Sequence, residues 1–316
     1  MSNWNRRTFI KSGALGTAAF TLLPMSSYLD LNAKDAEEPR FKISLAQWSF
    51  HKALQGNKLD HLDFPKKATD LGIYAVEYVN QFFKDKAADS TYLAEMNKRT
   101  GDLGVRQVLI MIDGEGGLAE TDNKLRTQAV TNHYKWIDAA KILGCHSIRV
   151  NAYGASDDPV ALHASAVASL STLATYAAPL GINVIVENHG GFSSDGLWLA
   201  HVMKEINMPN CGTLPDFGNF CLKQGVDANG KNICAEEYDK YRGVQQLLPF
   251  AKGVSAKSYD FDGQGNETTI DYKRMADIIK ASAYKGYIGI EYEGSRLSED
   301  KGVLATKKLL ERLIIM

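Results

Sequence analysis

The apolar positions of the chain fall into short runs that alternate with longer stretches of helical periodicity. After Pro39 the short runs are rich in β-branched and aromatic residues, and several are apolar at consecutive positions, as strands buried on both faces are. The eight runs are Phe41–Trp48, Ile73–Val79, Val105–Ile112, His146–Ala152, Ile182–Asn188, Cys211–Phe217, Ala251–Ser258 and Tyr287–Glu293. This pattern predicts eight buried parallel strands.

The stretches between these runs have the spacing of amphipathic helices that end at glycine. One apolar stripe at helical spacing consists of Ala166, Leu170, Leu173, Ala174 and Ala177. Leu-Gly pairs at 71–72, 103–104, 143–144 and 180–181 mark helix ends just before a strand. Eight strand–helix repeats predict an α/β fold, the (β/α)₈ TIM barrel, over residues 39–316. A doubly wound sheet is the alternative, but no G-x-G-x-x-G follows the first strand.

The first 38 residues have a different pattern, which is typical of a targeting segment. Arg6 and Arg7 precede Lys11, and a mild apolar run of twelve residues, 12–23, follows before Pro24. That run is shorter than the roughly 20 residues that span a bilayer. The order resembles a bacterial twin-arginine export signal. We therefore expect residues 1–38 to be a signal and a flexible segment, the protein to be periplasmic, and no membrane span after Leu23.

The charge balance of the chain bears on its binding partners, and its cysteines bear on the compartment in which it folds. The 36 Lys and Arg residues nearly balance the 37 Asp and Glu residues, and no basic tract stands out, so we do not expect nucleic acid as a partner. The four cysteines, none in a C-x-x-C pair, are Cys145, Cys211, Cys221 and Cys234. Cys221 and Cys234 could pair in an oxidising periplasm, but we favour buried free thiols. The glycine- and asparagine-rich stretch 219–235 is expected to be a loop or lid over the active face.

Carboxylates gather at the carboxyl ends of the predicted strands, where the active sites of TIM barrels lie. The segment VIVENHGG delivers Glu187 at the end of an apolar strand, LPDFGNF delivers Asp216, and IGIEYEG delivers Glu291. So many carboxylates in one mouth repel one another unless a cation lies among them. Oxygen ligands on separate rigid strands favour a divalent ion such as Mg²⁺, Mn²⁺ or Co²⁺, or Zn²⁺ if a histidine joins. The three carboxylates are therefore predicted metal ligands.

Further polar residues at the strand ends are candidates for catalysis or for binding a substrate. Lys257 and His189 are candidate catalytic groups, because both lie at the mouth. The candidate substrate contacts are Trp48, Glu77, Asn151, Asn219 and Ser255. For Glu77 and Arg149, a structural ion-pair role in the barrel is the alternative. Of Glu291 and Glu293, we expect only one to face the mouth.

Histidine is otherwise expected to be structural. The residues at 51, 133, 163 and 201 lie in or beside helical stretches, where we expect surface or helix positions. Only His189 lies in a glycine-rich turn directly after a strand. It is therefore the one histidine that we place at the mouth.

Six segments of the chain resemble the xylose isomerase-like TIM barrel superfamily, the group of sugar phosphate isomerases and epimerases that also includes proteins like the family 2 AP endonucleases. They are SLAQWSFH, LGIYAVEYV, VIVENHGG, LPDFGNF, SAKSYDF and GYIGIEYEG. The resemblance runs from Phe41 to the C-terminus. It implies a divalent metal held by a Glu, an Asp, a His and a Glu on the fifth to eighth strands. Glu187, Asp216 and Glu291 match this pattern.

Two positions depart from the pattern of the superfamily. Ser255 stands where relatives have a histidine ligand, and Asn219 stands where the epimerases have the histidine of D-x-x-H. Serine is a poor metal ligand, so the fourth ligand is left open. Both replacements put the usual ketose epimerase chemistry in question.

The resemblance implies an isomerase or epimerase that acts on a small keto-sugar or related carbohydrate. In such enzymes the metal polarises a carbonyl while glutamates move the proton on the neighbouring carbon. Glu187 and Glu291 are then the candidate bases, Lys257 reaches the developing oxyanion or pairs with a carboxylate, and His189 serves as acid or binds a hydroxyl.

Other functions stay open. The same enediolate can expel a glycosidic oxygen, which would make the protein a 3-keto-glycoside lyase or hydratase, and an exported enzyme meets glycosides more readily than sugar phosphates. The mouth also lacks a basic cluster for phosphate. A non-catalytic sugar-binding barrel is favoured by the two lost histidines and opposed by the three retained carboxylates. The endonuclease branch needs a histidine-rich zinc cluster and a basic groove, which the sequence lacks. Homo-oligomerisation is left open.

Overall fold

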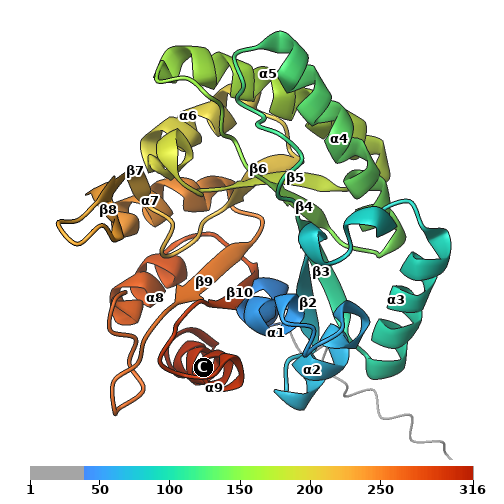
Figure 1. Cartoon of the computed structure of the whole chain (residues 1–316), viewed down its shortest axis with the longest axis vertical. Coiled ribbons are helices and arrows are strands. Elements are labelled where there is room, and N and C mark those ends of the chain that lie inside the picture. Colours follow the sequence, from blue (N-terminus) through green and yellow to red (C-terminus); the bar gives the residue numbers. More distant parts are fainter. Residues whose placement is uncertain (1–38, 316) are drawn as a thin grey trace, which may run out of the picture. The chain divides into compact units, whose positions relative to one another are not determined.

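The buried runs of the sequence form a parallel sheet that closes on itself, with helices around it (Figure 1). The computed structural model describes residues 39–315, so the twin-arginine segment lies outside the described residues. The barrel strands are β1 Phe41–Ala46, β2 Ala75–Val79, β3 Arg106–Met111, β4 Ser147–Val150, β5 Asn183–Glu187, β6 Cys211–Leu214, β9 Val254–Ser258 and β10 Gly286–Tyr292. Their order is β6-β5-β4-β3-β2-β1-β10-β9, which confirms the predicted eight-stranded α/β barrel.

The last seam of the barrel joins β6 to β9 by isolated contacts. Thr213 bridges Ala251 and Asp216 bridges Ser255, both in the parallel sense. The amide of Ser255 donates to the carbonyl of Pro215 at 2.9 Å, and the amide of Phe217 donates to the carbonyl of Ser255 at 3.1 Å. This seam therefore brings the side chain of Ser255, near the start of β9, against Asp216, just past the carboxyl end of β6.

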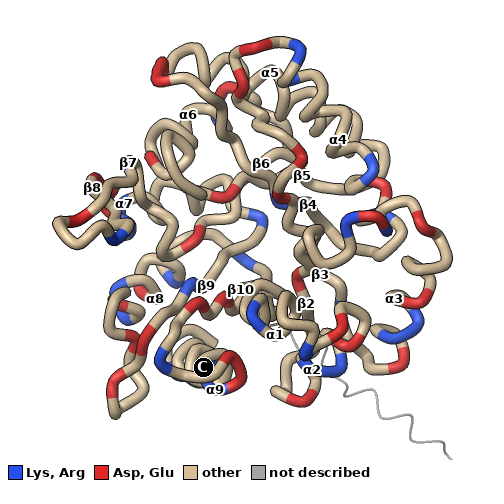
Figure 2. Tube along the Cα trace, viewed as in Figure 1, with Lys and Arg blue, Asp and Glu red and all other residues tan. Residues whose placement is uncertain are grey.

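Helices follow the strands and cover the outside of the sheet. They are α1 His51–Gln55, α2 Phe64–Asp70, α3 Ser90–Leu103, α4 Asn123–Ile142, α5 Pro159–Ala177, α6 Gly196–Ile206, α7 Lys240–Leu247, α8 Tyr272–Ala281 and α9 Glu299–Leu310. The short 3₁₀ turns are η1 Gln47–Phe50, η2 His61–Asp63, η3 Asn80–Phe82, η4 Lys84–Lys86, η5 Ala178–Leu180, η6 Gly191–Ser194 and η7 Leu248–Phe250, and a π turn, η8 Glu311–Ile315, ends the described chain. Figure 2 shows Lys and Arg positions interspersed with Asp and Glu positions along these helices.

The helix ends follow from local chemistry. From α3 to α8, each helix starts after an aspartate whose side chain accepts a hydrogen bond from a backbone amide of the first turn. These capping residues are Asp89, Asp122, Asp158, Asp195, Asp239 and Asp271. The four glycines of the Leu-Gly pairs all adopt a left-handed conformation, with φ between 64° and 70°. The predicted helix ends are thus confirmed.

Two apolar layers hold the barrel together. The larger layer lies between sheet and helices and includes the fully buried Trp136. The smaller layer fills the barrel interior and consists of Ala46, Ala75, Val79, Val108, Leu109, Met111, Ile185 and Leu214. Because this inner layer closes the barrel below the mouth, the polar residues at the strand ends have a rigid floor.

One described segment is apolar and long enough to meet the criteria for a membrane span. Pro159–Leu180, the 22 residues of α5 and η5, meets them, although we expected no such segment after Leu23. In the barrel, Leu170 and Leu173 of this segment are buried, and the helix packs against β5. Its apolar face is therefore the one that covers the sheet.

The stretch after β6 corrects two predictions. Residues 219–235 are not an irregular loop, because β7 Cys221–Val226 and β8 Asn232–Glu237 pair as an antiparallel hairpin. Cys221 and Cys234 are joined by a disulfide and are not buried free thiols, whereas Cys145 and Cys211 are buried and free as expected. Every residue of β8 is exposed, so the hairpin has no core face whose alternation could have predicted a strand.

Candidate active site

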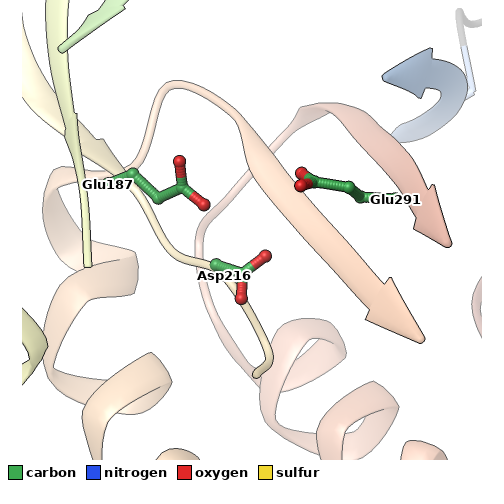
Figure 3. A group of neighbouring side chains, drawn as sticks. All are labelled: Glu187, Asp216 and Glu291. Carbon is green, nitrogen blue, oxygen red and sulfur yellow. The ribbon is translucent and has the colours of Figure 1, made fainter. Parts of the chain in front are cut away.

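The three predicted carboxylates meet at the carboxyl end of the barrel (Figure 3). Glu187 ends β5, Asp216 follows β6, and Glu291 lies near the end of β10. One oxygen of each lies within 4.8 Å of the others, and all three side chains are buried. Three strands that are separate in sequence therefore deliver their carboxylates to one point.

Lys257 of β9 is a buried cation beside this cluster. Its Nζ lies 2.6 Å from Oε1 of Glu291, 3.3 Å from Oε1 of Glu293 and 4.0 Å from Oδ2 of Asp216. Residues two apart on a strand point to the same side, so Glu291 and Glu293 both reach the ammonium. The expectation that only one of them faces the mouth is wrong.

Arg149 of β4 is the second buried cation. Its Nε lies 2.7 Å from Oε2 of Glu187, and its Nη1 donates to Oδ1 of Asp113 at 2.7 Å. The Nε–H does not point at Oε2, so the contact with Glu187 is an ion pair rather than a hydrogen bond. Arg149 thus links Asp113, at the end of the third strand, to the carboxylate cluster. An ion-pair role for Arg149 was one of the two interpretations of the sequence, but its partners Asp113 and Glu187 were not predicted.

Ser255 and Asn219, which replace the histidines of the resemblance, both hold carboxylates of the cluster. The Ser255 hydroxyl lies 2.6 Å from Oδ2 of Asp216 and 3.1 Å from Oε2 of Glu291. The amide of Asn219 donates to Oε1 of Glu187 at 3.0 Å. The two replacements therefore orient the predicted metal ligands.

Burial and neighbouring charges shift the pKa values of the three carboxyl groups in different directions. Burial raises the pKa of Glu187 and the pKa of Asp216, each to about 7, against the opposing effects of Arg149 and Lys257. Burial also acts on Glu291, but the adjacent Lys257 ammonium outweighs it and lowers the pKa of that carboxyl. Glu291 is thus held ionised, whereas Glu187 and Asp216 can take up a proton near neutral pH.

Glu77 of β2 lies at the floor of the mouth. Ser44 donates to its Oε1 at 2.5 Å, and its Oε2 has no hydrogen-bond partner among the described residues. Burial raises the pKa of Glu77 to about 8. A Cβ at Gly289 of β10 would lie 2.6 Å from both carboxylate oxygens, so a larger residue there would displace the carboxylate of Glu77. Ser44, rather than an arginine or lysine, is therefore its direct partner.

The remaining predicted residues line the rim. The indole of Trp48 donates to Glu293 and stacks on His51, with ring centroids 4.9 Å apart. The amide of Asn151 donates to Oδ1 of Asp113 at 2.7 Å. His189 is exposed in the turn after β5, and its ring forms no hydrogen bond with the described residues.

The other expected positions of histidine agree with the structure. Residues 51, 133, 163 and 201 lie on α1, α4, α5 and α6. His133 is buried, and His163 contacts Glu205. None of these four joins the group of carboxylates that could hold a metal.

Comparison with known proteins identifies the family. The profile of the family described as "Xylose isomerase-like TIM barrel" matches residues 65–313. The chain belongs to this family. The resemblance inferred from the six segments is thus confirmed, and no curated protein matches the chain in sequence.

Solved structures share the xylose isomerase-like barrel at low sequence identity. D-psicose 3-epimerase with D-tagatose from Clostridium cellulolyticum H10 is 12% identical, with a TM-score of 0.67 over 87% of this chain and 100% of that chain. A xylose isomerase-like TIM barrel protein from Mycobacterium smegmatis in complex with magnesium is 17% identical, with a TM-score of 0.61 over 86% of this chain and 96% of that one. AP endonuclease, family 2, from Brucella melitensis is 20% identical, with a TM-score of 0.60 over 84% and 96%. At these identities the likeness establishes the fold.

Proposed function

We propose that the protein is a metal-dependent sugar isomerase or epimerase that moves a proton next to the carbonyl of a keto-sugar. The observation that carries the proposal is the convergence of Glu187, Asp216 and Glu291 within 4.8 Å of one another at the barrel mouth. The sugar epimerases among the solved structures with the same fold support this reaction class.

The donor set fits a divalent cation. Six carboxylates, Glu77, Asp113, Glu187, Asp216, Glu291 and Glu293, surround two cationic side chains, Lys257 and Arg149. Four of the six, Glu77, Glu187, Asp216 and Glu291, are buried, and so many buried carboxyl groups are stabilised by a further positive charge. Oε2 of Glu187 is buried and has no hydrogen bond, although it lies 2.7 Å from Nε of Arg149. We assign Glu187, Asp216 and Glu291 as the ligands. The ion would supply Lewis-acid polarisation of the substrate carbonyl.

The residues of the chain provide the proton transfer and the orientation. Glu187 and Glu291 come from different strands, so one can remove the proton and the other can return it. Asn219 and Arg149 hold Glu187, while Lys257 holds Glu291 and adds positive charge beside the developing oxyanion. Trp48 offers an aromatic face at the rim, and His189 has a free ring for a substrate hydroxyl.

The decisive experiment is deuterium exchange. The metal-loaded protein is incubated in D₂O with a panel of keto-sugars, and NMR follows exchange at the carbon beside the carbonyl. We expect exchange with the wild type and a loss of at least a hundredfold with Glu187→Gln, because the amide cannot accept the proton. Glu205→Gln on the exposed side of α6 is the matched control and should exchange normally.

Two results would contradict the proposal. Exchange at the wild-type rate in Glu187→Gln would remove this residue as the base. A purified protein that contains no divalent ion and has no affinity for one would refute the metal-dependent reaction itself.

A 3-keto-glycoside lyase or hydratase is the second candidate. It uses the same proton abstraction and then expels a glycosidic oxygen. The acidic mouth favours it over any reaction of a sugar phosphate, because the carboxyl groups outnumber the two cationic side chains, Lys257 and Arg149, and disfavour an anionic substrate. Elimination products in the same NMR experiment identify it. In keeping with either reaction, we propose that the first 38 residues direct export to the periplasm, where glycosides are at hand.

A further inference from the structure

A cavity of about 730 Å³ opens between the loops that follow β4 and β5 and the base of the β7–β8 hairpin. We call it the hairpin cavity. Its volume falls in the range of about 300–1,000 Å³ that small-molecule sites occupy. Gly190 and Ala152 line it, and they directly follow His189 and Asn151 in sequence. The cavity therefore begins where the rim of the proposed active site ends.

One wall of the hairpin cavity is apolar and includes Tyr153, Phe192 and Leu222. Tyr153 is 47% exposed, but one side of its ring packs against Gly117. A Cβ at Gly117 would lie 3.0 Å from Cε2 of this ring, and the carbonyl of Tyr153 accepts a hydrogen bond from the amide of Ala119 at 2.9 Å. A fixed aromatic ring that is open on one side is a stacking surface for the apolar face of a sugar ring.

The rim of the hairpin cavity is acidic. Asp157 and Glu236 line it, and their carboxylates form no hydrogen bonds with the described residues. Lys223 is the cationic residue that lines the cavity beside them. Free carboxylates accept hydrogen bonds from sugar hydroxyls and repel anions. The rim thus suits an uncharged polyhydroxylated ligand and disfavours a phosphate.

The hairpin wall is covalently held. Leu222 and Lys223 come from β7 and Glu236 comes from β8, and the disulfide Cys221–Cys234 ties these two strands together. Strand β7 also packs against η6, which contains Phe192. The disulfide therefore fixes the spacing between the groups that the two strands contribute to the cavity.

We propose that the hairpin cavity is a second sugar subsite that takes the uncharged glycosyl unit joined to the reacting ring. The substrate is then a glycoside or disaccharide rather than a free monosaccharide. This inference rests on the proposed function, because that function places the reacting ring at the carboxylates next to the cavity.

Binding without turnover tests the subsite. Isothermal titration calorimetry of the full, oxidised chain compares glucose with the neutral disaccharides cellobiose, maltose and trehalose. We expect at least one disaccharide to bind at least tenfold more tightly than glucose. Tyr153→Ala should abolish that advantage and leave the affinity for glucose within twofold. Tyr74→Ala, which removes a ring that is 58% exposed just before β2, is the matched control and should change neither affinity.

Equal affinities for glucose and all three disaccharides would overturn the subsite. So would tighter disaccharide binding that persists in Tyr153→Ala, or a protein that binds none of these sugars. Leu222→Asn on the hairpin wall repeats the test if Tyr153→Ala does not fold. The deuterium-exchange experiment separates the two proposals. Tighter binding of a disaccharide without deuterium exchange supports the subsite and rejects the proposed reaction. Deuterium exchange without tighter binding of a disaccharide supports the reaction and rejects the subsite.

Discussion

The barrel mouth and the β7–β8 hairpin hold their functional groups in opposite ways. At the mouth, strands buried on both faces carry the carboxylates, and Lys257 and Arg149 pair with them in the interior. In the hairpin, the strands are largely exposed and a disulfide joins them. An isolated two-stranded hairpin is marginally stable in water. The mouth is therefore fixed by packing and charge, whereas the hairpin depends on a covalent bond.

The largest effect is expected from removing the buried cation Lys257 at the mouth. Lys257→Met keeps a side chain of similar size but leaves Glu291 and Glu293 without their partner. We expect a loss of about 3–5 kcal/mol in the free energy of unfolding, measured by urea denaturation without added metal. Lys273→Met on the exposed face of α8 is the control and should change stability by less than about 0.5 kcal/mol. A loss below about 1 kcal/mol in Lys257→Met would show that the pair does not hold the mouth.

The second prediction concerns the disulfide that joins the two strands of the hairpin. Replacing both Cys221 and Cys234 by serine opens a link between residues 13 apart in sequence. A loop of about 15 residues is worth roughly 3 kcal/mol in the chain-entropy model. We expect amide hydrogen exchange in β7 and β8 to become roughly a hundredfold faster. Amides of β1 and β2 in the same sample are the control and should keep their rates. Uniformly faster exchange in all four strands would contradict a local role.

The smallest effect concerns pH. Burial acts to raise the pKa of Asp113, but Arg149 outweighs it and lowers the value to about 2. A depressed pKa adds stability above the value of the unfolded chain, about 3.9, and that stability is lost as the pH falls to about 2. We expect the free energy of unfolding to fall by about 2 kcal/mol through this group as the pH is lowered. In Asp113→Asn this part of the pH dependence should be absent. The check is urea denaturation at pH 7 and pH 2.5, and the same pH dependence in the variant would disprove the assignment.

The sequence predicted those parts of the molecule that a buried, periodic strand specifies. Glu187, Asp216 and Glu291 each follow apolar residues on a strand whose end position is set by the barrel, so their meeting point could be foreseen. Ion-pair roles for Arg149 and Lys257 could be named from the sequence, but their partners could not, because the distances that decide among several carboxylates are not encoded in sequence spacing. The hairpin was missed because both of its faces meet solvent, and hydrophobic alternation cannot appear where neither face is buried.

The six capping aspartates have a consequence for the whole carboxyl face of the barrel. Each of α3 to α8 follows a strand, so its first turn and its capping aspartate lie on the same side as the mouth. These charges cancel much of the positive potential that helix amino ends would otherwise present to solvent. They also add negative charge to this side of the barrel, which favours the approach of small cations over that of anions. Changing these caps to serine would keep the helices and slow capture of the proposed metal ion, an effect that added salt would mask.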